Sequence, residues 1–174
     1  MAKFILIISL FLCFSPMALA QKSQALSQQA MESVRQQAHE MSALGIPGAQ
    51  AQKMLTLMVQ NRFQEQTRIR AQEIVITAAK EGLSTEPIMS KAMEGMAKQI
   101  KGQNIISAME AVYGRHAYAN QLAKSLSDDK NNIETMTQTI ADGLVAGMNA
   151  EEMEPVVTRL RVMTLQQTRN KAEN

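Results

Sequence analysis

The chain is 174 residues long, with 18 Lys and Arg residues, 16 Asp and Glu residues, and no Trp among its 3 % of aromatic residues. This length accommodates one domain, and the nearly balanced charge lacks the basic excess that is typical of nucleic-acid-binding proteins. The scarcity of aromatic side chains leaves little surface on which a sugar ring could stack, which disfavours a glycosidase. Cysteine occurs once, so no intramolecular disulfide bond can stabilise the fold.

Residues 1–20 have the organisation of a secretory signal peptide. Lys3 supplies the positive charge at the start, residues 4–14 (FILIISLFLCF) form the apolar run, and Ala18 and Ala20 occupy the small-residue positions of a signal-peptidase site. The apolar run is much shorter than the roughly 20 residues that span a bilayer. We therefore predict cleavage after Ala20 and export to the periplasm, or secretion into the medium, of a bacterium.

The remainder, residues 21–174, is predicted to be a single domain without a transmembrane segment. A lipoprotein anchor on Cys13 is rejected, because Leu12 precedes the cysteine where a small residue is required. Removal of the signal peptide also removes the cysteine. The exported domain must therefore be stabilised by the burial of apolar surface alone.

The exported domain has the composition and spacing of an all-α protein. Ala, Met, Gln, Glu, Lys and Leu dominate and favour helices, whereas the alternating Val, Ile and Tyr runs that predict strands are missing. The first helix is predicted to end at Gly45, two residues before Pro47, and its apolar residues recur every three or four positions. These residues are Leu26, Ala30, Val34, Ala38 and Met41.

The next segment, residues 49–81, contains neither Gly nor Pro and is predicted to be one long helix. Its ends carry apolar residues, but its middle, residues 60–68 (QNRFQEQTR), offers only Phe63 for burial. A straight helix of this length would extend for roughly 50 Å, which exceeds the width of a compact domain of this size. A bend near Asn61 is the alternative.

Glycine residues are predicted to join the helices in the second half of the chain. Residues 94–105 align without gaps on residues 142–153, and both segments begin with an acidic residue, a glycine and an apolar residue. Residues 82–89 match the second half of this pattern, and residues 45–50 match it loosely. Glycine readily adopts the left-handed conformation that ends a helix. The sequence therefore predicts glycine-punctuated helix–turn–helix joints.

Four further apolar stripes predict the remaining helices, at residues 88–96, 105–122, 133–144 and 153–163. Residues 128–132 (DDKNN) superficially suggest a calcium loop, but they lack the turn glycine and the terminal Glu of such a loop, and Lys130 occupies a ligand position. We interpret this segment as a helix N-cap. The expected fold is an array or bundle of about six helices in one all-α domain.

Residues 81–98 contain Glu-Gly-Leu, Lys-Ala and Glu-Gly-Met-Ala-Lys in succession. This pattern resembles a short motif of uncharacterised, exported, all-helical bacterial proteins. The resemblance covers residues 80–113 and, more faintly, residues 141–160. It implies a helical repeat and a location in the cell envelope, and it carries no catalytic or cofactor-binding residues to transfer.

The two histidines do not belong to a recognisable catalytic motif. His39 and Glu40 begin like the helix motif of zinc proteases, but Ala43 stands where the second His is required. His116 lies on the apolar stripe of its helix and is interpreted as a hydrogen-bonded or half-buried side chain. Nucleophile-elbow, phosphate-loop and dinucleotide-binding patterns are missing. We therefore predict no enzyme activity, no catalytic residues and no cofactor.

Methionine is abundant, with 14 residues, and is interpreted mainly as adaptable core filler. Thioether sulfur also binds Cu(I) and Ag(I), so a soft-metal site is kept as an alternative. Its candidate ligands are Met89, Met93, Met96, His39 and Met41.

These observations predict a non-enzymatic exported protein that binds a protein or envelope partner and no nucleic acid. Assembly into a homo-oligomer is compatible with this function. A second alternative is a periplasmic chaperone, because the chain is similar to Spy-like chaperones in size, helical composition and abundance of Gln and Met. However, Met163 replaces the Leu of their Leu-Thr-x-x-Gln signature, and the Gln that follows Leu55 and Thr56 comes one residue late. No residue role is transferred from that family.

Overall fold

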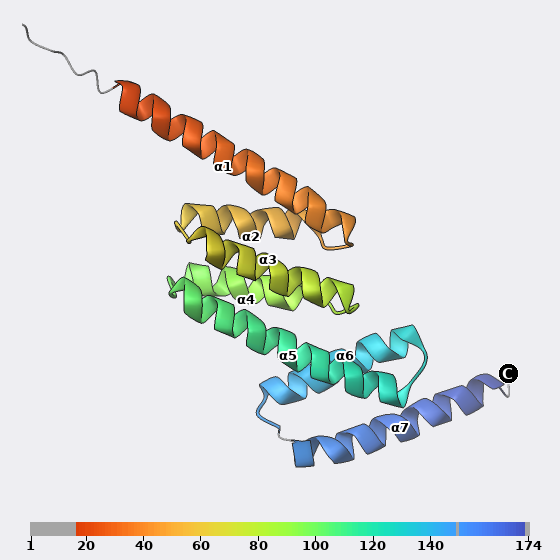
Figure 1. The fold of residues 1–174 in the computed structure, drawn as a ribbon. Helices are drawn as coiled ribbons and strands as arrows, with labels where there is room; N and C mark the ends of the chain where they lie inside the picture. The colour runs from red at the N-terminus through yellow and green to blue at the C-terminus, as the bar shows by residue number, and fades with distance from the viewer. Residues whose placement is uncertain (1–16, 149, 173–174) are drawn as a thin grey trace, which may run out of the picture.

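The computed structural model describes residues 17–148 and 150–172, and within them the chain forms seven helices and no strand (Figure 1). The helices are α1 (Met17–Ala43), α2 (Gly48–Gln60), α3 (Glu65–Lys80), α4 (Glu86–Ala97), α5 (Gly102–Leu126), α6 (Lys130–Val145) and α7 (Ala150–Ala172). The predicted all-α class is confirmed. There is one helix more than expected because residues 49–81 form two helices.

The prediction of one long helix over residues 49–81 is wrong, and the chain bends near Asn61 instead. Arg62 adopts a φ of 56°, and the N–H of Phe63 donates a hydrogen bond to the carbonyl of Met58 at 3.0 Å. The polar middle of the segment has no apolar stripe that a straight helix could bury. The bend lets Phe63 pack against the core and gives α3 a buried face of its own.

The helices form a stack that follows the chain from α1 at one end to α7 at the other, with the chain reversing direction at each joint (Figure 1). α1 pairs with α2, α4 with α5, and α5 with α6. In addition, α2 packs on α4, and α3 packs on α5. Helices that are two apart in the chain are therefore neighbours, which arranges this part of the stack in two layers.

Five of the joints close with the same backbone hydrogen bonds. At each of them a residue in the left-handed conformation follows the helix. The N–H of this residue and the N–H of the next residue donate to carbonyls of the last turn, as in the Schellman motif. The left-handed residues are Gly45, Arg62, Gly82, Gln99 and Gly147. Each is followed by an apolar residue, and these are Ile46, Phe63, Leu83, Ile100 and Met148. The left-handed conformation costs glycine little, whereas Arg62 and Gln99 adopt it at a cost of roughly 1–2 kcal/mol.

Polar side chains connect helices that are two apart. Gln72 of α3 donates to Gln37 of α1 at 3.0 Å. Arg70 of α3 donates to Glu110 of α5 at 2.7 Å. Arg70 and Glu110 are exposed, so water screens their ion pair and it contributes little to stability. The bond between Gln72 and Gln37 is part-buried and joins uncharged groups, so it contributes about 1 kcal/mol. The main contribution to stability must therefore come from the apolar core.

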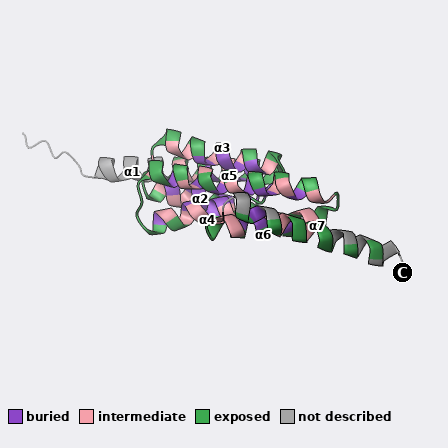
Figure 2. Ribbon diagram, turned by 90° about the horizontal axis from the view of Figure 1, so that it is seen from below, coloured by how far each residue is buried: buried purple, intermediate pink, exposed green. Residues whose placement is uncertain are grey.

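The buried residues, purple in Figure 2, form two clusters along the stack. The larger cluster extends from α1 to the first half of α5 and includes Met54 and Met89. The smaller cluster combines Ala119 of α5 with Ile140 of α6 and Met153 of α7. α5 therefore belongs to both clusters and connects them.

The predicted signal peptide lies largely outside the described residues, since residues 1–16 are not among them. α1 begins at Met17 and continues past the predicted cleavage position after Ala20. Among the helices at residues 17–148 and 150–172, none combines the length and the apolar character that crossing a membrane requires.

The close approach of α4 to α5 predicts that Gly95→Ala destabilises the fold. A Cβ atom at this position would lie 2.7 Å from Cγ1 of Ile105, and Ile105 is itself buried with 1 % exposure, so one of the two helices would have to shift. Overpacking of this kind costs about 1–3 kcal/mol. The midpoint of urea denaturation, followed by circular dichroism, should therefore decrease.

Gly114→Ala is the matched control, because Gly114 lies inside α5 and a Cβ atom there would meet nothing within 4 Å. Alanine is the better helix former by about 1 kcal/mol, so this variant should raise the midpoint. A Gly95→Ala protein as stable as Gly114→Ala would show that α4 and α5 are not in tight contact at this point.

Candidate functional site

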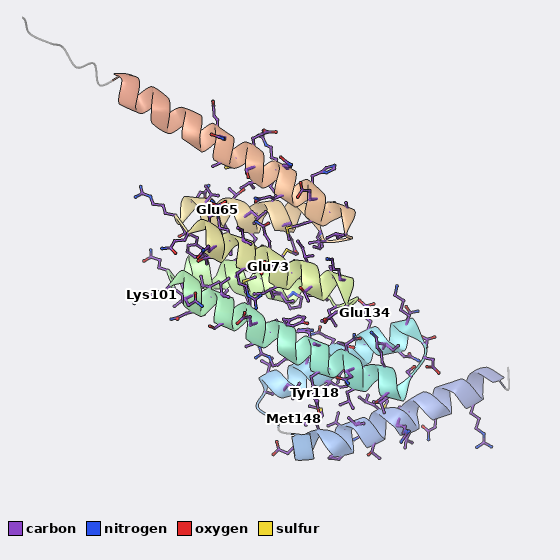
Figure 3. All side chains as sticks on the ribbon, in the orientation of Figure 1. Glu65, Glu73, Lys101, Tyr118, Glu134 and Met148 are labelled. Atoms are coloured by element: carbon purple, nitrogen blue, oxygen red, sulfur yellow. The ribbon has the colours of Figure 1, made fainter. Side chains whose placement is uncertain are left out.

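A groove lies between the α3–α4 joint, the second half of α5 and the first half of α6, and it has a volume of about 910 Å³. Its lining consists of Gly82, Leu83, Ser84, His116, Asn120, Lys124, Lys130, Ile133, Glu134, Thr135, Thr137, Gln138 and Thr139. Figure 3 labels Glu134 on α6, near the end of the α3–α4 hairpin. Leu83 and Ile133 give the groove an apolar part, and the remaining side chains are mostly uncharged hydrogen-bonding groups.

The groove occurs where the regular stacking of helices is interrupted. α2 packs on α4, but α6 packs on α5 and α7 and makes little contact with α4. The α5–α6 joint also differs from the other joints, because Ser127 is extended, with a φ of −153° and a ψ of 146°. This different joint leaves the space between α6 and the α3–α4 joint open.

The N-cap interpretation of residues 128–132 is confirmed. The carboxylate of Asp129 accepts hydrogen bonds from the backbone N–H groups of Asn131 at 2.9 Å and Asn132 at 3.1 Å. These bonds satisfy free donors in the first turn of α6. The carboxylate of Asp129 therefore caps the N-terminus of α6, the helix that forms one wall of the groove.

His116 is the most deeply buried polar side chain that lines the groove, with 7 % exposure. Burial lowers its pKa, the positive charge of Arg115 lowers the pKa further, and the carboxylate of Asp142 partly offsets these effects. Among the described residues its imidazole has no hydrogen-bond partner. His116 thus presents a neutral ring, with one donor and one acceptor, to the groove at neutral pH.

The hydroxyl groups on the α6 wall are already hydrogen-bonded. Thr135, Thr137 and Thr139 donate to carbonyls four residues earlier in the helix, at 3.0, 2.7 and 2.9 Å. The amide of Gln138 donates to Asp142 at 2.8 Å. These donors are occupied within α6, so the polar side chains available to a ligand are those of α5 together with Lys130 and Glu134 of α6.

A hydrogen bond holds the third wall of the groove in place. The hydroxyl of Tyr113 on α5 donates a hydrogen bond to Oε1 of Glu81 at 2.8 Å. Because only the protonated hydroxyl can donate this bond, the bond raises the pKa of Tyr113. Glu81 directly precedes Gly82, where the wall formed by the α3–α4 joint begins. The Tyr113–Glu81 bond therefore ties this joint to α5 one turn away from His116.

The structure places the candidate soft-metal ligands in different environments. Met41 of α1 and Met89 and Met96 of α4 are buried in the larger cluster, and Met93 packs against that cluster. His39 is exposed on α1, and it lies two positions from Met41, so the two side chains do not share a face of the helix. Within the described part of the chain, no group of three or more His, Cys, Asp and Glu residues could hold a metal ion. Soft-metal binding stays a prediction.

No protein-family model, no curated protein and no solved structure matches this chain. What the groove can bind is therefore derived from the groove's own lining.

The sequence placed His116 on an apolar stripe but did not predict the groove around it. The interpretation of this side chain as hydrogen-bonded or half-buried is corrected: it is buried, with 7 % exposure, and it has no hydrogen bond with the described residues. One signal was available: His116, Asn120 and Lys124 follow each other at four-residue intervals, so they share one face of a helix. The wall at Ser84 could not be found in this way, because it reaches the groove only through the stacking of the helices.

The lowered pKa of His116 predicts that acid destabilises the protein through this residue. The unfolded chain takes up a proton near the ordinary value of 6.5, whereas the native ring takes up its proton only at a lower pH. The contribution of the neutral His116 ring to stability is therefore fully present above the pKa of the unfolded chain, and it is lost as the pH falls below that value. Between about pH 7.5 and about pH 5.5, the midpoint of urea denaturation should fall more for the wild-type chain than for His116→Gln. Equal decreases in both proteins would contradict the assignment.

Proposed function

We propose that the chain is an exported helical protein that binds an extended segment of a partner protein in the groove between α5, α6 and the α3–α4 joint. The observation that carries this proposal is the groove itself, in which an apolar part is bordered by uncharged hydrogen-bonding side chains. An extended peptide needs both, since its main chain requires hydrogen-bond partners and its side chains require apolar surface. The proposed activity is binding without catalysis.

The balance of charge near the groove supports a peptide over a nucleic acid or a strongly charged ligand. Lys124 and Lys130 line the groove together with Glu134, and the adjoining turn adds Asp128 and Asp129. Charges of both signs leave no extended field that would attract a polyanion.

Export is the second part of the proposal and rests on the sequence at residues 1–20. A positive charge at Lys3, a short apolar run and small residues at Ala18 and Ala20 are the features of a cleaved signal peptide. The absence of cysteine from residues 21–174 suits an oxidising compartment, because no free thiol can react there.

We also infer that the joints derive from one glycine-punctuated helix–turn–helix unit. Gly95 and Gly143 align in the sequence, and their carbonyls accept the equivalent hydrogen bonds, from Ile100 at 3.0 Å and from Met148 at 3.1 Å. This similarity supports the resemblance to exported helical-repeat proteins. Repeat proteins commonly bind other proteins on the surface that their stacked helices create.

Cleavage after Ala20 predicts the mass of the secreted product. When the full-length gene is expressed in a bacterium, mass spectrometry of the periplasmic fraction or medium should detect a chain that begins at Gln21. An Ala20→Arg chain, with a large residue in place of the small one, should keep its leader. Recovery of the intact chain from the cytoplasm in both cases would contradict export.

Binding in the groove predicts that a bulky side chain at Ser84 blocks it. We expect selection from a library of displayed random dodecapeptides to enrich peptides that bind the purified protein. Ser84→Trp should weaken their binding by roughly tenfold or more, measured by fluorescence anisotropy, because Ser84 is exposed and lines the groove.

Ser90→Trp is the control, since Ser90 is also exposed, lies on α4 and does not line the groove. Circular dichroism should show that both variants keep the fold. A selection without enrichment, or peptides that bind Ser84→Trp unchanged, would refute the proposed site.

A further inference from the structure

Three side chains on one face of α5 line the groove at equal intervals. These are His116, Asn120 and Lys124, at positions i, i+4 and i+8. Four residues of an α-helix rise by about 6 Å, and two residues of an extended strand rise by about 6.6 Å. The spacing of the three side chains therefore closely matches every second residue of an extended peptide that lies along α5.

All three side chains have unused hydrogen-bonding capacity. Among the described residues, none of them has a side-chain hydrogen bond or an ion pair. This distinguishes them from the threonines of the opposite wall, because the hydroxyls of Thr135, Thr137 and Thr139 bond to the backbone of α6. His116 lines the groove with 7 % exposure, so a partner for its ring nitrogens can reach them from the groove.

We propose that this row of side chains, the α5 ladder, binds the main chain of an extended partner segment. The inference rests on the proposed function of the groove. The carboxamide of Asn120 accepts a hydrogen bond from a peptide N–H and donates one to a peptide carbonyl, since an amide offers both groups. The neutral ring of His116 bonds to a main-chain group two residues away, and the ammonium group of Lys124 donates to a carbonyl oxygen at the other end.

The remaining lining residues define the class of segment that fits. Alternate side chains of an extended segment point to opposite sides, so one set can contact the apolar surface of Leu83 and Ile133. The ladder is three side chains long and contacts about five peptide residues. Because the ladder binds the main chain, it tolerates varied side chains, and the preference for an apolar residue comes from Leu83 and Ile133. Proline is excluded opposite Asn120, since proline has no N–H to donate.

The proposal is tested with the dodecapeptides enriched on the purified full chain. Asn120→Leu removes the carboxamide while nearly keeping the size of the side chain, and it should weaken binding by roughly tenfold. Asn104→Leu is the matched control, because Asn104 is exposed on the same helix and does not line the groove. It should bind like the wild-type chain.

A second measurement needs no protein variant and therefore does not depend on folding. Methylating one peptide nitrogen at a time removes one N–H without changing the side chains, and the wild-type protein should lose affinity at alternate positions in the centre of the peptide. The ladder would be overturned if the peptides bind Asn120→Leu unchanged and tolerate every methylation. If the same peptides fail to bind Ser84→Trp, the groove nevertheless remains the binding site. If no peptide is enriched, both proposals fail.

Discussion

The architecture depends on a pair of backbone hydrogen bonds that closes five of its joints. Each pair uses a residue in the left-handed conformation to turn the chain back, and places an apolar residue directly after the turn. The bonds satisfy carbonyls that the end of a helix leaves without partners, and the apolar residue fixes the direction in which the chain continues. Repetition of this joint produces a stack in which helices two apart in the chain become neighbours.

The candidate site exists because this repetition is interrupted once. α5 has 25 residues, whereas α3 has 16, and it ends in an extended Ser127 rather than in a left-handed residue. As a result, α6 packs on α5 and α7 and leaves the side facing the α3–α4 joint uncovered. A polar face of α5 that another helix would otherwise cover is exposed to a groove.

Much of the fold could be predicted from the sequence. The spacing of apolar residues identified the helices, and the first helix was predicted with the residues that the structure buries, Val34, Ala38 and Met41 among them. The abundant methionines are also mostly core residues, and Met54, Met58, Met89, Met109 and Met153 are all buried. Their flexible side chains fill irregular gaps, and methionine spacing alone does not distinguish this use from metal binding.

The sequence was less informative where a joint lacks glycine. At Arg62 and Gln99 the left-handed conformation is adopted without glycine. Phe63, which follows Arg62, packs against the larger cluster. Ile100, which follows Gln99, is 42 % exposed, so the backbone hydrogen bonds of the joint hold the conformation there. Local propensity therefore favoured a continuous helix over residues 49–81, and burial of Phe63 and of one face of α3 overrode that propensity. The groove could not be predicted for a related reason, since Ser84 and Asn120 meet only after three helices have stacked.

The division of the core into two clusters has a consequence for the energetics of the molecule. Among the described residues, the cluster shared by α6, α7 and the end of α5 contains fewer buried side chains than the cluster of α1 to α5, so it forms the weaker of two cooperative units and opens first in local unfolding. The groove lies at the boundary, with Leu83 in one unit and Ile133 in the other. A ligand that occupies it contacts both units, and its binding free energy adds to the resistance of the weaker unit to unfolding. Occupancy would thus suppress amide hydrogen exchange in α6 and α7, far beyond the residues that touch the ligand.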